Sequence, residues 1–116
     1  MMNNKMTLDE FQQACKTTDC YKPDQRLMCL GFGLGSEVGE VLGKLDKSFR
    51  QHGELTEEFR MLTVKEVFDV LWFAVMLADE LGFTMSEVAE MGLHKLAERA
   101  KQGKICGFGD EREKAK

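Results

Sequence analysis

The 116-residue sequence has one proline, one tryptophan, one tyrosine and no long apolar run. Its longest uninterrupted apolar stretch, residues 70–78, is well short of the roughly 20 residues that a helix needs to span a bilayer. The N-terminal residues MMNNKMTLDEF lack the apolar region of a secretory signal. We therefore expect a soluble, cytoplasmic protein without a membrane partner.

An excess of positive charge and closely paired cysteines are also missing. The formal net charge is −4, whereas a nucleic-acid polymer is bound by a surplus of Lys and Arg, so we expect no such partner. The same argument does not exclude a nucleotide that is held through a metal ion. The four cysteines include no C-x-x-C pair, which argues against a zinc site and a disulfide framework. We expect them to be reduced thiols with a passive role.

The distribution of apolar residues predicts helices separated by short polar breaks. The length suits one domain, which we place at residues 1–108, followed by a charged and mobile tail at residues 109–116. Helices are expected from Leu8 to a point before Tyr21, and at about residues 26–49, 64–81 and 84–101. A polar break is predicted at residues 50–55. Residues 56–62 could begin the third helix or form a connecting turn.

The predicted fold class is all-α, a bundle of four to five helices completed by oligomerisation. The reason is the centre of the third helix, residues 67–78, which is apolar nearly all the way round. Neighbouring helices of so small a chain would not cover it, so a subunit interface is expected there.

The stretch GFGLGSEVGEV, residues 31–41, resembles a glycine-rich phosphate loop but carries two carboxylates. A dinucleotide-binding G-x-G-x-x-G motif needs a preceding strand and a third glycine where this chain has Ser36. In a helix each glycine costs up to about 1 kcal/mol relative to alanine, so another benefit must offset them. We interpret these glycines as positions where helices approach closely.

Glu37 and Glu40 are three residues apart, as are Glu66 and Asp69, so each pair shares one helical face. If the two helices pack antiparallel, the pairs can converge, and a cation between them would offset their repulsion. An all-oxygen site without histidine suits Mg²⁺, with Mn²⁺ as an alternative. The other interpretation is a solvated acidic face. Asp69 argues against it, because it lies in the most apolar segment, where an unpaired charge costs several kcal/mol.

The segments GLGSEVGEV, KEVFDVLWFAVMLADELGF and HKLAER resemble the MazG-like nucleoside triphosphate pyrophosphohydrolases over about residues 8–108. These belong to the all-α NTP pyrophosphatase superfamily, whose mark is E-x-x-E followed by E-x-x-D. The resemblance implies a homodimer or homotetramer with Mg²⁺ held by Glu37, Glu40, Glu66 and Asp69. It also implies hydrolysis of a (d)NTP between the α and β phosphates, releasing a monophosphate and pyrophosphate. Glu37 or Glu40 would act as the catalytic base.

Four further residues are candidates for substrate binding. Lys44, Lys95 and Arg99 could bind phosphates, the last two within the stretch that matches the family's K-L-x-x-R, although all three could equally form surface ion pairs. Trp72 could stack on a base or belong to the core. Many family members have asparagine where this chain has Gly92, so any contact made through that side chain must be replaced or absent.

Other functions are compatible with the same pattern. A helical metal- or nucleotide-binding assembly module without turnover would keep these carboxylates. A phosphoribosyl-ATP pyrophosphohydrolase belongs to the same superfamily. A di-iron carboxylate bundle would show E-x-x-H pairs, and none occurs. The sequence leaves open the base and sugar preference, the choice between dimer and tetramer, and which carboxylate activates the water.

Overall fold

The computed structural model describes residues 5–106 and contains four helices, with no strand among these residues. In chain order they are α1 (Leu8–Lys16), α2 (Arg26–His52), α3 (Glu57–Glu80) and α4 (Met85–Lys101). The predicted all-α class is confirmed. The predicted tail, residues 109–116, lies outside the described residues.

Two predicted boundaries change in the structure. Helix α2 continues to His52, so the break expected at residues 50–55 is shorter and begins later. Helix α3 begins at Glu57, so residues 57–62 belong to this helix and do not form a connecting turn. The predicted capping boxes are both present, Thr7 with Glu10 before α1 and Thr84 with Glu87 before α4.

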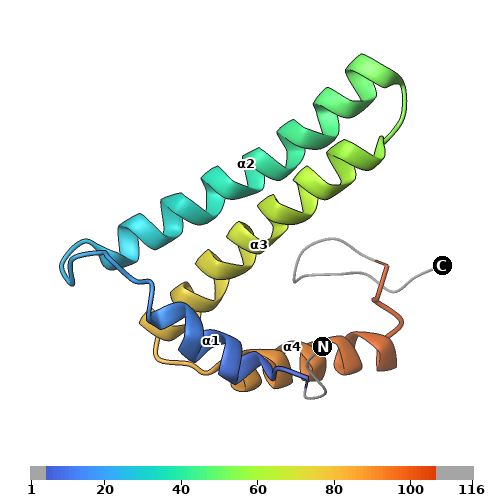
Figure 1. Ribbon diagram of the computed structural model, residues 1–116. Helices are drawn as coiled ribbons and strands as arrows, with labels where there is room; N and C mark the ends of the chain where they lie inside the picture. The colour runs from blue at the N-terminus through green and yellow to red at the C-terminus, as the bar shows by residue number, and fades with distance from the viewer. Residues whose placement is uncertain (1–4, 107–116) are drawn as a thin grey trace.

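Helices α2 and α3 form a long antiparallel hairpin (Figure 1). At its turn, Gly53 ends α2 with a φ of +72°, a left-handed conformation that glycine adopts without a steric penalty. The buried Ser48 hydroxyl donates to the Glu54 carbonyl over 2.7 Å and accepts from the Thr56 amide over 3.0 Å. At the other end, Arg26 pairs with Asp19 and, over 2.8 Å, with Glu80. Both ends of the hairpin are therefore tied by side chains.

Close contact between the two long helices depends on Gly33. A Cβ atom added at this position would lie 2.2 Å from a ring carbon of Phe73 on α3, far inside any real contact distance. The expectation that glycines allow close helix approach is confirmed here. The other glycines of α2 have no atom within 4 Å of an added Cβ: Gly31, Gly35, Gly39 and Gly43.

Helix α1 connects α3 to the start of α4. The buried Gln12 side chain donates from Nε2 to the carbonyls of Val75 and Phe83, both at 3.1 Å, and its Oε1 accepts from the Met85 amide over 3.0 Å. Asp9 accepts from the amide and the hydroxyl of Ser86. These contacts hold the first turn of α4, and satisfy every polar atom of a buried amide.

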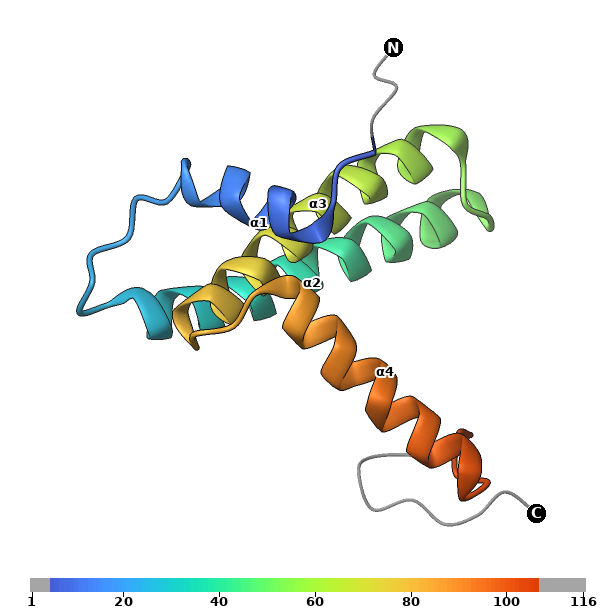
Figure 2. The same ribbon diagram turned by 90° about the horizontal axis from the view of Figure 1, so that it is seen from below.

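Within the described residues, the buried hydrophobic core is small and consists of Cys15, Leu30, Val75 and Met76. Helix α4 buries no residue and contacts α1 and α3 but not α2. Figure 2 shows α4 leaving the hairpin as an arm. The apolar centre of α3 is left partly open in the single chain, since Val67, Phe68 and Leu71 are all exposed. None of the described helices is both long and apolar enough to cross a membrane.

Replacing Gly33 with alanine should destabilise the protein by about 1–3 kcal/mol, because the new methyl group must displace the Phe73 ring. Gly43→Ala is the matched control, since nothing lies within 4 Å of its added Cβ and the change should be neutral or stabilise by up to about 1 kcal/mol. Urea unfolding followed by circular dichroism measures both. Equal effects of the two substitutions would contradict the packing role of Gly33.

Candidate functional site

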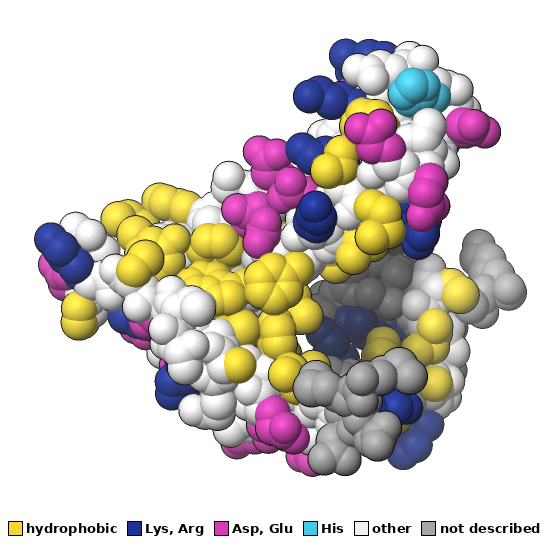
Figure 3. All heavy atoms as spheres, viewed as in Figure 1, with side chains coloured by type: hydrophobic (Ala, Val, Ile, Leu, Met, Phe, Trp, Pro, Cys, Tyr) yellow, Lys and Arg dark blue, Asp and Glu magenta, His cyan; other side chains and the backbone are white. Residues whose placement is uncertain are grey.

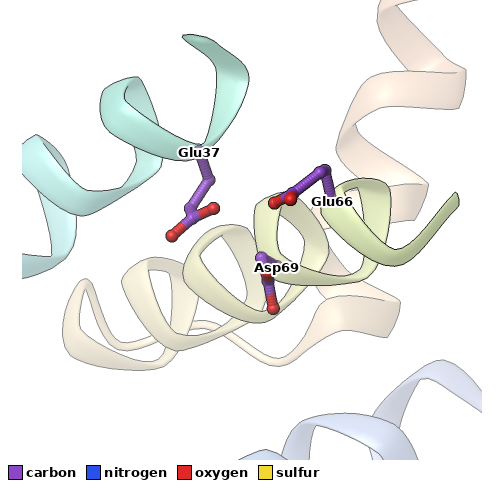
Figure 4. A group of neighbouring side chains, drawn as sticks. All are labelled: Glu37, Glu66 and Asp69. Atoms are coloured by element: carbon purple, nitrogen blue, oxygen red, sulfur yellow. The ribbon is translucent and has the colours of Figure 1, made fainter. Parts of the chain in front are cut away.

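Three of the four predicted carboxylates meet across the hairpin. One carboxylate oxygen each from Glu37 on α2 and from Glu66 and Asp69 on α3 lie within 4.8 Å of one another. Figure 4 shows Glu37 reaching from one helix toward Glu66 and Asp69 on the other. All three residues are partly buried. The antiparallel packing assumed in the sequence analysis therefore does bring residues from both acidic pairs together.

The cluster is electrostatically unfavourable by itself. Burial raises the pKa of Glu37, and the neighbouring charges of Asp69, Glu66 and Glu40 raise it further. Lys44 on α2 offsets part of the charge, with its Nζ 3.7 Å from Glu66. Among residues 5–106, neither Glu37 nor Asp69 makes a side-chain hydrogen bond or ion pair. A cation between the three carboxylates would remove the repulsion.

The donor set fits a hard divalent cation. All available ligands are carboxylate oxygens, and Mg²⁺ binds such oxygens at about 2.0–2.1 Å, so two ligands of one ion lie up to about 4 Å apart. Oxygens that already lie within 4.8 Å of one another need at most a small side-chain adjustment to reach that spacing. Glu37, Glu66 and Asp69 are the residues that would hold the ion.

Glu40, the fourth predicted ligand, lies outside this group. Its side chain is 56% exposed and approaches Lys44, with 3.9 Å between Oε2 and Nζ. Lys44 thus lies between Glu40 and Glu66, on the same side of the hairpin as the cluster. The structure therefore places Lys44 beside the carboxylates, where it forms ion pairs with two of them.

Trp72 packs within an aromatic group rather than among the carboxylates. Its indole N–H donates to the Thr18 hydroxyl over 2.8 Å, and its ring lies 5.0 Å from that of Phe73 and 6.5 Å from that of Tyr21, measured between centroids. It is partly buried against the hydrophobic core. This environment favours the core interpretation of Trp72.

Tyr21 is a candidate for substrate binding that the sequence analysis did not identify. Burial raises the pKa of its hydroxyl, and the charges of Cys20, Cys29 and, last, Glu37 raise it further. Its ring also faces Phe73, with 6.5 Å between centroids. The only signal in the sequence is that the sole tyrosine lies two residues before the sole proline, in the segment that precedes the glycine-rich helix.

Lys95 and Arg99 lie on α4, which does not contact α2 in the part of the chain that is described. Packing within one chain therefore does not bring these two cations to Glu37. Gly92 and Lys95 line an open hollow together with Phe83, Val88 and Met91. An added Cβ at Gly92 would meet no atom within 4 Å, so this chain has space for the asparagine that it lacks.

Comparison with known proteins identifies a family. The family model of the MazG nucleotide pyrophosphohydrolase domain matches residues 29–103, more than half of the chain and the whole of α3. The Gene 37 protein of Mycobacterium phage L5 is 33% identical over 114 residues, covering 92% of this chain and 100% of that protein. No solved structure matches the chain.

Replacing Glu37 with glutamine should stabilise the metal-free protein at neutral pH. Because the pKa of Glu37 is raised in the folded state, its charge opposes folding above that pKa, and stability is regained as the pH falls through it. The variant mimics the protonated form, so its advantage in melting temperature should shrink at acidic pH.

Added Mg²⁺ should make the wild type more stable than Glu37→Gln. An ion that binds only the folded state stabilises it, so the melting temperature of the wild type should rise much more than that of the variant. Thermal melts with EDTA and with millimolar Mg²⁺ measure this effect. Glu90→Gln, an exposed position on α4, is the control and should respond as the wild type does. A wild type that is indifferent to Mg²⁺ and Mn²⁺ would argue against a metal centre.

Proposed function

The chain belongs to the MazG nucleotide pyrophosphohydrolase family, and on this basis we propose that it is a Mg²⁺-dependent enzyme that hydrolyses a (d)NTP to a monophosphate and pyrophosphate. The observation that carries the proposal is the group of three carboxylates from α2 and α3, all inside the matched range. Its role would be nucleotide-pool clean-up.

Carboxylates and phosphates repel each other, so the acidic cluster can take a triphosphate only through a cation. A bound Mg²⁺ would neutralise phosphate charge and make a water molecule more acidic. Glu37, Glu66 and Asp69 would hold the ion, and Lys44, already 3.7 Å from Glu66, would offer its ammonium to a phosphate oxygen. The reaction also needs a general base, a group that accepts a proton from the attacking water.

We assign the proton acceptor to Glu40. It is one helical turn from Glu37, lies outside the group of three, and has an exposed carboxylate that can meet water. Glu37 is less suited, because its carboxylate lies with those of Glu66 and Asp69 in the group that would hold the cation. The base of the nucleotide would stack on Tyr21, whose hydroxyl interacts with the charge of Glu37.

Incubation with Mg²⁺ and a panel of ordinary and modified nucleoside triphosphates tests the activity, with monophosphate, diphosphate, pyrophosphate and phosphate resolved. Monophosphate and pyrophosphate should appear in equal amounts. Asp69→Asn should lose about 100-fold or more in rate together with the Mg²⁺ stabilisation, whereas Glu40→Gln should lose rate but keep that stabilisation. Glu90→Gln is the control.

The alternatives give different results in the same assay. Turnover of phosphoribosyl-ATP alone would assign the chain to that pyrophosphohydrolase. Mg²⁺ and nucleotide binding without turnover of any substrate would favour the non-catalytic module and turn attention to Gly92.

We also propose that the chain is a homodimer or homotetramer. Figure 3 shows hydrophobic side chains gathered over the hairpin beside a group of acidic ones. An apolar hollow lies between the two helices, lined by Val38, Val41, Leu42, Val67 and Val70. The chain exposes 8877 Å², against about 6,400 Å² for a compact monomer of 13.2 kDa. The difference of about 2,500 Å² per chain lies at the upper end of the roughly 1,000–2,500 Å² that each subunit of an obligate dimer buries.

Light scattering should therefore return two or four times the 13.2 kDa chain mass. Leu42→Glu combined with Val67→Glu should shift the mass toward the monomer, because both exposed side chains border the apolar hollow. Lys47→Glu, on an exposed polar position of the same helix, is the control and should leave the mass unchanged. A monomeric wild type would contradict the proposal.

A further inference from the structure

The Lys44 side chain joins the two acidic pairs of the hairpin. Its Nζ is 3.9 Å from Oε2 of Glu40, one turn earlier on α2, and 3.7 Å from Oε1 of Glu66, across the hairpin on α3. The lysine side chain is 25% exposed, so its charge is screened less than that of a fully exposed lysine. The ammonium therefore meets one carboxylate from each pair.

These contacts divide the four carboxylates between two places that suit positive charge. In the first, Glu37, Glu66 and Asp69 offer oxygens within 4.8 Å of one another, a spacing that suits a divalent cation. In the second, the Lys44 ammonium bridges Glu40 and Glu66. Glu66 belongs to both places, and Figure 4 shows its carboxylate directed toward Glu37. The hairpin thus supplies a cation of its own at the second place.

The charges favour one divalent cation beside this ammonium. One such ion and Lys44 together neutralise three of the four carboxylate charges. A second divalent ion would depend on Glu40, and it would have to lie beside the ammonium or displace it. The first is opposed by repulsion between like charges, and the second breaks two ion pairs of a largely covered lysine. The pair of Glu40 with Lys44 also has the favourable order along a helix, with the acid on the N-terminal side.

We propose that Lys44 takes the place of a second divalent cation, so that each nucleotide-free chain holds one metal ion, at Glu37, Glu66 and Asp69. This rests on the proposed function, in which those three carboxylates hold the ion. Lys44 then acts through Glu40 as a positioning residue, because it keeps that carboxylate off the metal and free to accept a proton from water. An ammonium has three N–H donors, so pairing with two carboxylates leaves one for a phosphate oxygen.

Counting bound Mn²⁺ by equilibrium dialysis tests the role of Lys44. No nucleotide is added, because a triphosphate brings an ion of its own. The wild type should bind one ion per chain. Lys44→Met and Lys44→Gln remove the charge and should each bind two, with the altered electron paramagnetic resonance spectrum of two neighbouring Mn²⁺ ions. Circular dichroism checks that each variant is folded. Lys47→Met, at an exposed position of the same helix, is the matched control and should bind one.

Two further variants identify where the second ion binds. Lys44→Arg keeps the charge and should keep the count at one, whereas adding Glu40→Gln to Lys44→Met should return the count from two to one. Two ions on the wild type, or one ion on both folded neutral variants, overturn the inference and leave the proposed hydrolysis standing. The expected counts without turnover of any triphosphate support the inference and refute the proposed function alone. A wild type that binds no ion overturns the inference together with the metal centre.

Discussion

The repulsion among three partly buried carboxylates is the constraint on which this structure depends. Glu37, Glu66 and Asp69 are held within 4.8 Å of one another although burial and mutual charge already raise the pKa of Glu37. The hairpin keeps them there because contacts at its middle and at both ends hold the two helices together. Gly33 lets the backbones approach, Ser48 ties the turn, and Arg26 ties the open end. A cation would turn this unfavourable arrangement into a binding site, and in the proposed function that cation would recruit a nucleoside triphosphate.

The glycines of α2 have two different roles. Gly33 faces α3 and is needed for contact inside the chain, whereas Gly31, Gly35 and Gly39 face open space. Helix propensity would favour alanine at the outward positions, so their cost must be offset by something outside the single chain. A partner helix on this face would provide the offset. The homo-oligomer proposed above would cover this surface.

Much of the site was predictable because helical periodicity is local. Residues three apart share a face in any helix, so the pairing of Glu66 with Asp69 followed from spacing alone. The apolar surroundings of Asp69 indicated that its carboxylate needs a partner. The helix boundaries near Thr7 and Thr84 followed from capping boxes. Spacing did not reveal that Glu40 turns away toward Lys44, because a side chain's direction at the edge of a face depends on the neighbouring helix. Tyr21 was missed because it lies in a loop, where no periodicity exists.

The sequence by itself determined the helical class, the two acidic pairs and, through its resemblance to a known family, the chemistry to expect. These follow from short-range rules: capping, periodicity and motif spacing act within a few residues. Only the tertiary structure decided which carboxylates meet, that Trp72 packs against Thr18 and Phe73, and that α4 points away from α2. Such features depend on contacts between segments that are distant in the chain, here set by Gln12 and Gly33, and no local pattern encodes the direction in which a packed helix leaves its neighbour.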